Sequence, residues 1–153
     1  MPVMGRPLGQ RSRRRSRGQS LVEFAMVLPI FMLILSGILD FGFLLYSRMT
    51  VINAAREGAR AAIMVSDYST IEEVAVGAAE SSAAGGGISV TVPTPLICLQ
   101  TSVSVSSPTP IGCASAKSGD SVVVEVDYTY HTFFPLAFGS TFNLSSTVQM
   151  VIE

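Results

Sequence analysis

The chain has 153 residues, of which 48% are hydrophobic and only 14% are charged. An ordinary soluble domain has about 25% charged residues, so this composition is apolar for its length. The length corresponds to about one domain and excludes a large multidomain enzyme, while the apolar content excludes disorder throughout the chain. One His and two Cys leave little material for a metal site or a redox centre.

The formal net charge of −1 conceals a strong asymmetry along the chain. Residues 1–18 carry six Arg and no acidic residue, and their Gly, Pro and Ser content indicates a solvated arm without a core. Residues 61–153 carry eight acidic residues against one Lys, which gives this part a net charge of −7. The two ends of the chain therefore carry opposite charges.

Residues 21–45 form an apolar run, LVEFAMVLPIFMLILSGILDFGFLL. Its 25 residues correspond to about 37 Å of helix, which is longer than the ~30 Å hydrocarbon core of a bilayer. The run is apolar all round, which argues against an amphipathic helix on the membrane surface. It also exceeds the ~7–15 apolar residues of a secretory signal. We therefore expect an uncleaved anchor rather than signal removal at Ala59-Arg60-Ala61.

The distribution of Arg predicts the orientation of this anchor. The positive-inside rule places residues 1–18 in the cytoplasm and the acidic remainder of the chain outside the inner membrane. Tyr46 and Arg48 follow the apolar run, where an aromatic ring and a snorkelling cation suit the outer interface. The predicted protein is thus a single-pass protein of the bacterial inner membrane, with a cytoplasmic N-terminus and an extracytoplasmic C-terminal domain.

The helix is predicted to continue beyond the membrane through residues 47–65, which contain no Pro. Small side chains recur there at four-residue spacing, at Thr50, Ala54, Gly58 and Ala62. This small-residue ridge would let another helix or a sheet approach closely. A second helix, with a Ser or Thr cap, is predicted over residues 69–83 and is ended by three consecutive Gly.

The remainder of the chain changes to the two-residue period of half-buried strands. Apolar and polar residues alternate in three segments, around 88–92, 122–131 and 142–152, and a fourth strand at 102–106 is short. The long helix is expected to cover the apolar face of this antiparallel sheet. The predicted fold class is α+β: a long N-terminal transmembrane helix, a second helix and a sheet of three or four antiparallel strands.

Cys98 and Cys113 both fall in the part of the chain predicted to lie outside the cytoplasm. Because an extracytoplasmic compartment can be oxidising, we expect a disulfide between them. It would enclose 14 residues, and closing such a loop stabilises a small domain by about 3 kcal/mol in the chain-entropy model. Two unpaired thiols are the alternative, whereas a metal site needs more ligands than two Cys.

Two acidic residues interrupt the apolar run, although a charge at the bilayer centre costs at least ~2.5 kcal/mol. Glu23 lies at the cytoplasmic start of the run. Asp40 lies near its outer end, where we expect the carboxylate to be partly hydrated. A pairing role for Asp40 inside a helix bundle is the alternative.

The junction between the basic arm and the apolar run carries a recognisable motif. Gly18 is separated by Gln19-Ser20-Leu21-Val22 from Glu23, and Phe24 follows. This motif resembles the processing site of type IV prepilins, in particular the G-x-x-x-x-E-[YF] form of tight-adherence (Flp-type) pilus systems. The wider sequence is more specific. GQSLVEFAMVLPIFMLILSGILDFG, followed by NAAREGARAA at 53–62, resembles a TadE-like protein of the tight-adherence apparatus.

The resemblance implies cleavage between Gly18 and Gln19 by a prepilin peptidase, which is a membrane aspartic peptidase. Gly suits such a site because it has no side chain and lets an extended backbone enter a narrow active site. Cleavage would leave the helix in the membrane with a new amine at Gln19, four positions before Glu23 on one helix face. In prepilins the matching Glu is thought to meet the terminal amine of a neighbouring subunit, which would offset the cost of a carboxylate in lipid.

The resemblance also assigns a set of residues to recognition and assembly, namely Glu23, Phe24, Pro29 and Asp40. Pro29 stands five residues after Phe24, as in TadE-like proteins, whereas major type IV pilins carry their helix-breaking Pro further along. Its position therefore favours the TadE group over a major pilin. A kink whose freed carbonyl is satisfied locally is the alternative role for Pro29.

The sequence gives little support to other chemistry. A Ser/His/Asp hydrolase would need His131 with Asp120 or Asp127, and no G-x-S-x-G elbow is present. The Arg cluster at 11–17 could hold nucleic acid, but membrane topology and anionic headgroups explain it more simply.

The apolar loop at 131–139 is expected to tuck beneath the helix; otherwise it docks a partner or the outer leaflet. We predict no catalytic residue, cofactor, metal ion, nucleic acid or small-molecule substrate.

The sequence therefore indicates a minor pseudopilin or pilus-assembly component, a structural and interaction protein rather than an enzyme. Its span and its small-residue ridge are predicted to pack with pilin-like subunits or with the assembly platform in the membrane. The competing class is a single-pass, membrane-tethered extracytoplasmic binding module unrelated to pili. The chain divides into a basic leader (1–18), a transmembrane helix (19–46), an extramembrane helical region (47–84) and a sheet domain (85–153).

Overall fold

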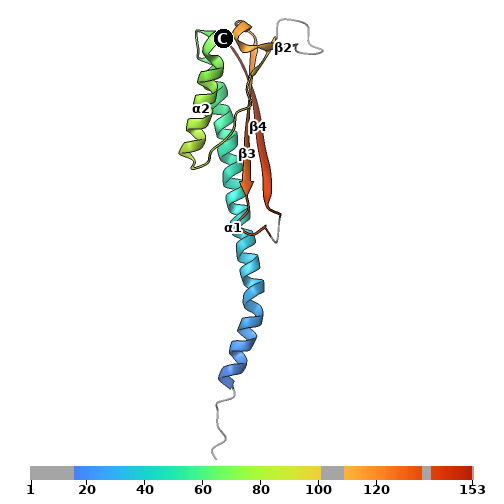
Figure 1. Ribbon diagram of the computed structural model, residues 1–153. Coiled ribbons are helices and arrows are strands. Elements are labelled where there is room, and N and C mark those ends of the chain that lie inside the picture. Colours follow the sequence, from blue (N-terminus) through green and yellow to red (C-terminus); the bar gives the residue numbers. More distant parts are fainter. Residues whose placement is uncertain (1–15, 101–108, 136–138, 153) are drawn as a thin grey trace, which may run out of the picture.

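The computed structural model describes residues 16–100, 109–135 and 139–152. Along these residues the elements are α1 (Ser16–Ile63), α2 (Ile71–Gly85), β1 (Ile97–Gln100), β2 (Thr109–Gly112), β3 (Ser121–His131) and β4 (Thr141–Val151). Figure 1 shows α1 running the length of the molecule, with α2 and the sheet packed beside its C-terminal half. The predicted α+β class, with a long N-terminal helix and an antiparallel sheet, is confirmed.

The two halves of α1 differ in their surroundings. The 48 residues of the helix correspond to about 72 Å of length. Every side chain from Leu21 to Leu35 is exposed, whereas from Ser47 onwards one face is buried. Among the described residues, the helix segment from Gly18 to Ile63 is long and apolar enough to cross a membrane. One helix is therefore an exposed apolar rod at its N-terminal end and a core element at its C-terminal end.

The second helix packs along α1 through a row of small side chains. Its buried residues recur at four-residue spacing, at Ile71, Ala75, Ala79 and Ala83. A Cβ added at Gly58 of α1 would lie 2.9 Å from the carbonyl oxygen of Ala75 and 3.0 Å from the Cβ of Ala79. The helices therefore approach closely at Gly58, because the facing residues Ala75 and Ala79 are small.

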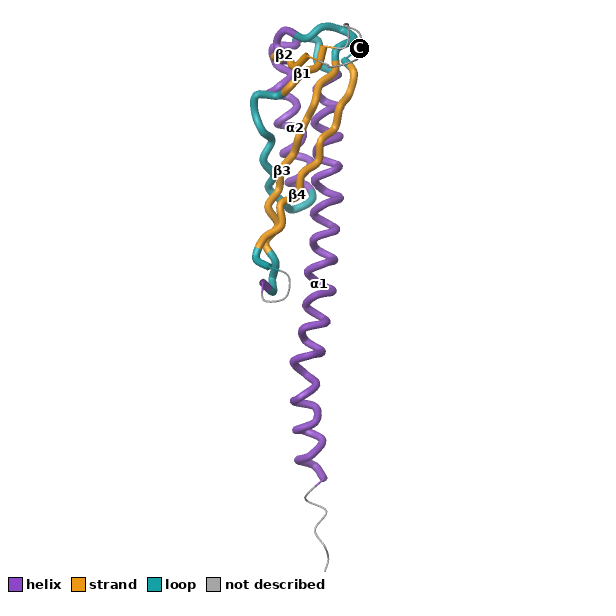
Figure 2. The backbone as a smooth tube through the Cα atoms, turned by 90° about the vertical axis from the view of Figure 1, so that its right-hand side faces the viewer, coloured by secondary structure: helices purple, strands orange, loops and turns teal. Residues whose placement is uncertain are grey.

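The four described strands form one antiparallel sheet in the order β2-β1-β3-β4. β3 and β4 pair along all 11 residues of each strand as a long hairpin. Val122, Val124 and Val126 of β3 are fully buried in the core that the sheet shares with the helices. Figures 1 and 2 show this hairpin running back beside α1 toward the middle of the long helix. The hairpin turn therefore lies beside the apolar half of α1.

The period-two pattern located the two long strands. β3 and β4 fall within one residue of the predicted segments 122–131 and 142–152 at each end. The short strands β1 and β2 were not predicted, since four residues are too few for an alternation to be recognised. The strand expected at 102–106 lies outside the described residues.

The strand expected at 88–92 is wrong. This segment joins the sheet only through an isolated bridge between Thr91 and Asp127, in which each N–H donates to the other carbonyl at 2.8 Å. Pro93 and Pro95 follow, and because proline has no N–H to donate, a ladder cannot continue through them. The alternating Ile and Val residues therefore cover the core without forming a strand.

A disulfide joins Cys98 of β1 to Cys113, which follows β2, with a Cα–Cα distance of 5.0 Å. Both residues are buried. The expected pairing is confirmed, and the alternative of two unpaired thiols is wrong. The bond links the two short strands at the edge of the sheet, where few residues are available to hold them by packing.

The close contact at Gly58 gives a direct test of the helix packing. We expect Gly58→Val to lower the free energy of unfolding by about 1–3 kcal/mol, because its side chain would overlap atoms of Ala75 and Ala79. Gly77→Ala on α2 is the control, since a Cβ there meets no atom within 4 Å and should raise stability by up to ~1 kcal/mol. Thermal unfolding of the two full-length variants in detergent, followed by circular dichroism, measures both. An unchanged midpoint for Gly58→Val would contradict the packing.

Candidate membrane-anchor and assembly site

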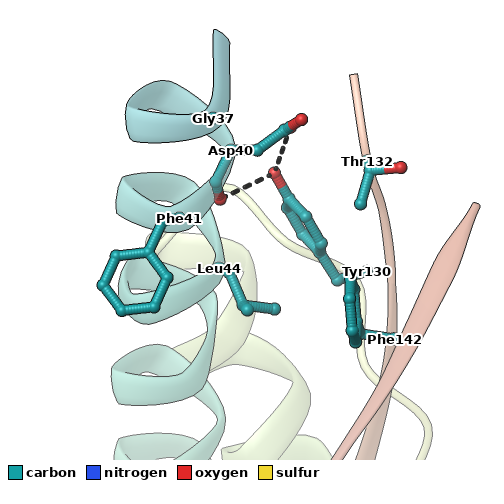
Figure 3. Close-up of a pocket in the computed structure, with 7 residues that line it drawn as sticks. All are labelled: Gly37, Asp40, Phe41, Leu44, Tyr130, Thr132 and Phe142. Atoms are coloured by element: carbon teal, nitrogen blue, oxygen red, sulfur yellow. Dashed lines mark hydrogen bonds between the residues drawn. The ribbon is translucent and has the colours of Figure 1, made fainter. Parts of the chain in front are cut away.

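Asp40 lies near the end of the exposed half of α1 and is itself only 4% exposed. The turn after β3 covers it. The backbone N–H of Phe133 donates to Oδ1 at 2.8 Å, and the N–H of Phe134 donates to Oδ2 at 3.1 Å. The Tyr130 hydroxyl lies 3.3 Å from Oδ1 and 3.4 Å from the Asp40 carbonyl oxygen (Figure 3). Both carboxylate oxygens therefore accept hydrogen bonds from groups 90 to 94 residues further along the chain.

The Tyr130 hydroxyl acts as a donor because it keeps its proton. Tyr130 is 5% exposed. Burial raises the pKa of Tyr130 above its usual value of 10.0, and the negative charge of Asp40 raises it further. A protonated phenol donates to a carboxylate, whereas an ionised one would repel it. The Tyr130 hydroxyl is therefore protonated at neutral pH, where it can donate to the carboxylate.

The expectation that Asp40 is partly hydrated is wrong. Within this chain, its partners come from the end of β3 and the hairpin turn that follows. Two of them are backbone N–H groups, which every residue but proline carries and which leave no signal in a sequence. The third, Tyr130, was assigned to a strand, but nothing local indicated that this strand returns to the apolar run.

A pocket lies beside this cluster, between α1 and the hairpin (Figure 3). It is lined by Gly37, Asp40, Phe41, Leu44, Tyr130, Thr132 and Phe142. The polar atoms of this set are already bonded: Asp40 to Tyr130, and the Thr132 hydroxyl to the carbonyl oxygen of Gly139 at 2.6 Å. The remaining surface is apolar and offers no free acid, base or nucleophile.

At the other end of the apolar half, Gly18 and Gln19 lie in the first turn of α1. The amide Nε2 of Gln19 donates to Oε1 of Glu23 at 3.2 Å, so the two residues share one helix face, as their spacing predicts. A Cβ added at Gly18 would meet no atom within 4 Å. Packing within the chain therefore does not require glycine at this position.

The residues assigned to recognition lie on the exposed part of the helix. Glu23, Phe24 and Pro29 are all exposed, and α1 continues on both sides of Pro29. These side chains are free to meet lipid or a neighbouring helix. Asp40 differs from them, because the hairpin turn already occupies its carboxylate.

The small-residue ridge is occupied within the chain. Ala54 and Ala62 are fully buried, and Gly58 lies against α2 and within contact distance of Val124 in β3. A surface covered by α2 and the sheet cannot also bind another subunit. The ridge is therefore not available to pilin-like subunits, and the exposed apolar half of α1 is the part of the helix that remains open to them.

The residues considered for hydrolysis do not come together. Asp120 precedes β3, and its Oδ2 accepts the backbone N–H of Lys117 at 2.9 Å. His131 ends the 11-residue strand and is exposed, which at ~3.3 Å per residue separates it by more than 30 Å from Asp120 and by about 13 Å from Asp127. Within the described ranges, no three His, Cys, Asp or Glu residues are grouped so that they could hold a metal ion.

Comparison with known protein families gives a match to the N-terminal part of the chain. Residues 18–60 match the family model TadE-like protein, which confirms the resemblance that the sequence predicted. The match starts at Gly18 and ends three residues before the end of α1. No curated protein and no solved structure matches the chain. The matched residues cover most of the apolar helix segment that is long enough to cross a membrane, which supports membrane association.

The carboxylate contact predicts how the hairpin turn responds to loss of Asp40. We expect Asp40→Ala to speed hydrogen exchange of the Phe133 and Phe134 amides by ~10- to 100-fold, because a hydrogen bond to a charged group is worth ~1.5–3 kcal/mol. Asp67→Ala is the control, since this carboxylate caps the turn before α2 by accepting the N–H of Ser69. Exchange mass spectrometry on the full chain in detergent measures both. If the Phe133 and Phe134 amides exchanged equally fast in Asp40→Ala and Asp67→Ala, the assignment of Asp40 as their acceptor would be contradicted.

Proposed function

We propose that this chain, whose residues 18–60 match the TadE-like family, is a minor pseudopilin or pilus-assembly component of a tight-adherence system. The observation that carries the proposal is the coincidence of the family match with α1, the anchor and backbone of the molecule. The match begins at the glycine of the processing motif. A structural role follows, in which the helix holds the protein in the membrane and the sheet domain is presented to partners.

The exposed half of α1 is the surface proposed for assembly. Its side chains from Leu21 to Leu35 have no cover from the rest of the chain. In a membrane such a rod packs against lipid or against other helices. Pilin-like subunits and the assembly platform are therefore its proposed partners, and they meet the rod rather than the small-residue ridge.

The proposed topology places the basic leader in the cytoplasm and the sheet domain outside the inner membrane. Two independent observations support it. The six Arg of residues 1–18 favour the cytoplasmic side under the positive-inside rule. The Cys98–Cys113 disulfide belongs to the opposite end of the molecule, and disulfides persist in oxidising compartments outside the cytoplasm.

We further propose that a prepilin peptidase cuts the chain between Gly18 and Gln19. The absence of a packing reason for Gly18 supports a role in recognition, because a side chain there would disturb nothing in the fold. After cleavage the amine of Gln19 and the carboxylate of Glu23 lie on one exposed helix face. That carboxylate is then positioned to pair with the terminal amine of a neighbouring subunit, which offsets its cost in lipid.

N-terminal analysis of the mature protein tests this processing. In cells with an active prepilin peptidase, the chain is expected to begin at Gln19, and Gly18→Leu is expected to keep its leader. Gly42→Leu makes the same change further along α1, at a position where a Cβ also meets no atom within 4 Å, and should still be processed. A wild-type chain that begins at Met1 despite the active peptidase would refute the cleavage but leave the anchor in place.

The gene neighbourhood separates the proposed function from a tethered binding module unrelated to pili. A secretion ATPase and a prepilin peptidase encoded nearby would favour the pilus role. Their absence, together with an uncut leader, would favour the tethered module.

A further inference from the structure

The turn of the β3–β4 hairpin presents two aromatic side chains outward. Phe133 is 66% exposed and Phe134 is 49% exposed. We call these two residues the aromatic tip. The ring of Phe133 lies 5.5 Å, between centroids, from the ring of Phe43 on α1, which is itself half exposed. The aromatic tip therefore continues an apolar surface that begins on the membrane helix.

Several backbone N–H groups in the described part of this turn have partners within the chain. The N–H groups of Phe133 and Phe134 both donate to the carboxylate of Asp40, and Pro135 has no N–H. The N–H of Thr132 donates to the Ser140 carbonyl oxygen at 3.2 Å. A turn in water does not need such partners, whereas an unpaired backbone group in a bilayer costs several kcal/mol. The N–H groups of Thr132, Phe133 and Phe134 are therefore paired, while the two Phe side chains are exposed.

The position of the turn along α1 matches the edge of a bilayer. From Leu21 to Asp40 there are 20 residues, which correspond to about 30 Å of helix and to the thickness of a hydrocarbon core. Asp40, and with it the aromatic tip, therefore lies at the boundary of that core. Phe41 and Tyr46 of α1 are exposed at the same end of the span, and tyrosine is enriched at membrane interfaces.

We propose that the aromatic tip inserts into the interfacial layer of the phospholipid leaflet next to the sheet domain. The protein then has two membrane contacts, the span of α1 and the hairpin turn beside it. Two contacts fix how the sheet domain is rotated and tilted over the membrane, which a single helix would leave free. The proposal rests on membrane anchoring by α1 alone and does not depend on a role in pili.

Tryptophan fluorescence tests this insertion directly, because the chain contains no Trp. Phe133→Trp and Phe134→Trp each place one reporter on the aromatic tip. Ile97→Trp, at a half-exposed position in β1, is the matched control, because Ile97 pairs with Val123 near the start of β3, far from the turn. The full-length variants are reconstituted at low protein density into phosphatidylcholine vesicles. Quenching is then measured with lipids brominated near the headgroup end of their chains and with aqueous iodide.

The proposal predicts that the two tip variants lose most of their emission to the brominated lipid and little to iodide. Ile97→Trp should show the reverse. Iodide quenching of the tip variants equal to that of Ile97→Trp, without quenching by brominated lipid, would overturn the proposal. Protection from iodide that grows with protein density, again without lipid quenching, would mean that a second copy covers the tip and would overturn it as well. Circular dichroism of each variant verifies the fold.

Discussion

The buried carboxylate of Asp40 must have hydrogen-bond donors, and the proposed position at the edge of the hydrocarbon core makes this requirement stricter. Asp40 obtains its donors from the turn of the β3–β4 hairpin and from Tyr130 at the end of β3. Because the turn must reach Asp40, the hairpin extends along α1 from the core to the apolar half. The contact therefore fixes where the sheet lies along α1 and toward which end of α1 the hairpin points.

The other end of the molecule is held by close packing of small residues. Alanines and Gly58 let α2 and β3 approach α1, and the Cys98–Cys113 bond secures the short strands β1 and β2. This packing buries one face of the C-terminal half of α1 and leaves the side chains from Leu21 to Leu35 exposed. The same helix can therefore join a folded domain to a membrane assembly, with a different half committed to each.

Long, regular patterns predicted the fold well and short or distant ones did not. The apolar run and the four-residue spacing of small residues indicated α1, the Ser or Thr cap and the three Gly indicated α2, and the alternation indicated β3 and β4. The four residues of β1 are too few for an alternation to be recognised. The alternation at 88–92 suggested a strand, but the prolines after Val92 prevent a ladder from forming there. The processing motif was recognisable because its residues are contiguous. The surroundings of Asp40 were not, because backbone donors from a turn more than 90 residues away leave no mark on the local sequence.

The central claim is that α1 leaves the hydrocarbon core at Asp40, where the hairpin turn meets it. Single nitroxide labels placed on exposed positions of α1 from Leu21 to Met49 measure this in lipid vesicles, through collision with oxygen and with a water-soluble nickel complex. The account predicts that oxygen contact dominates up to Leu39 and that nickel contact takes over just beyond Asp40. Oxygen contact that still dominates at Leu45 and Met49 would place the carboxylate and the turn deep in lipid, and would contradict the account.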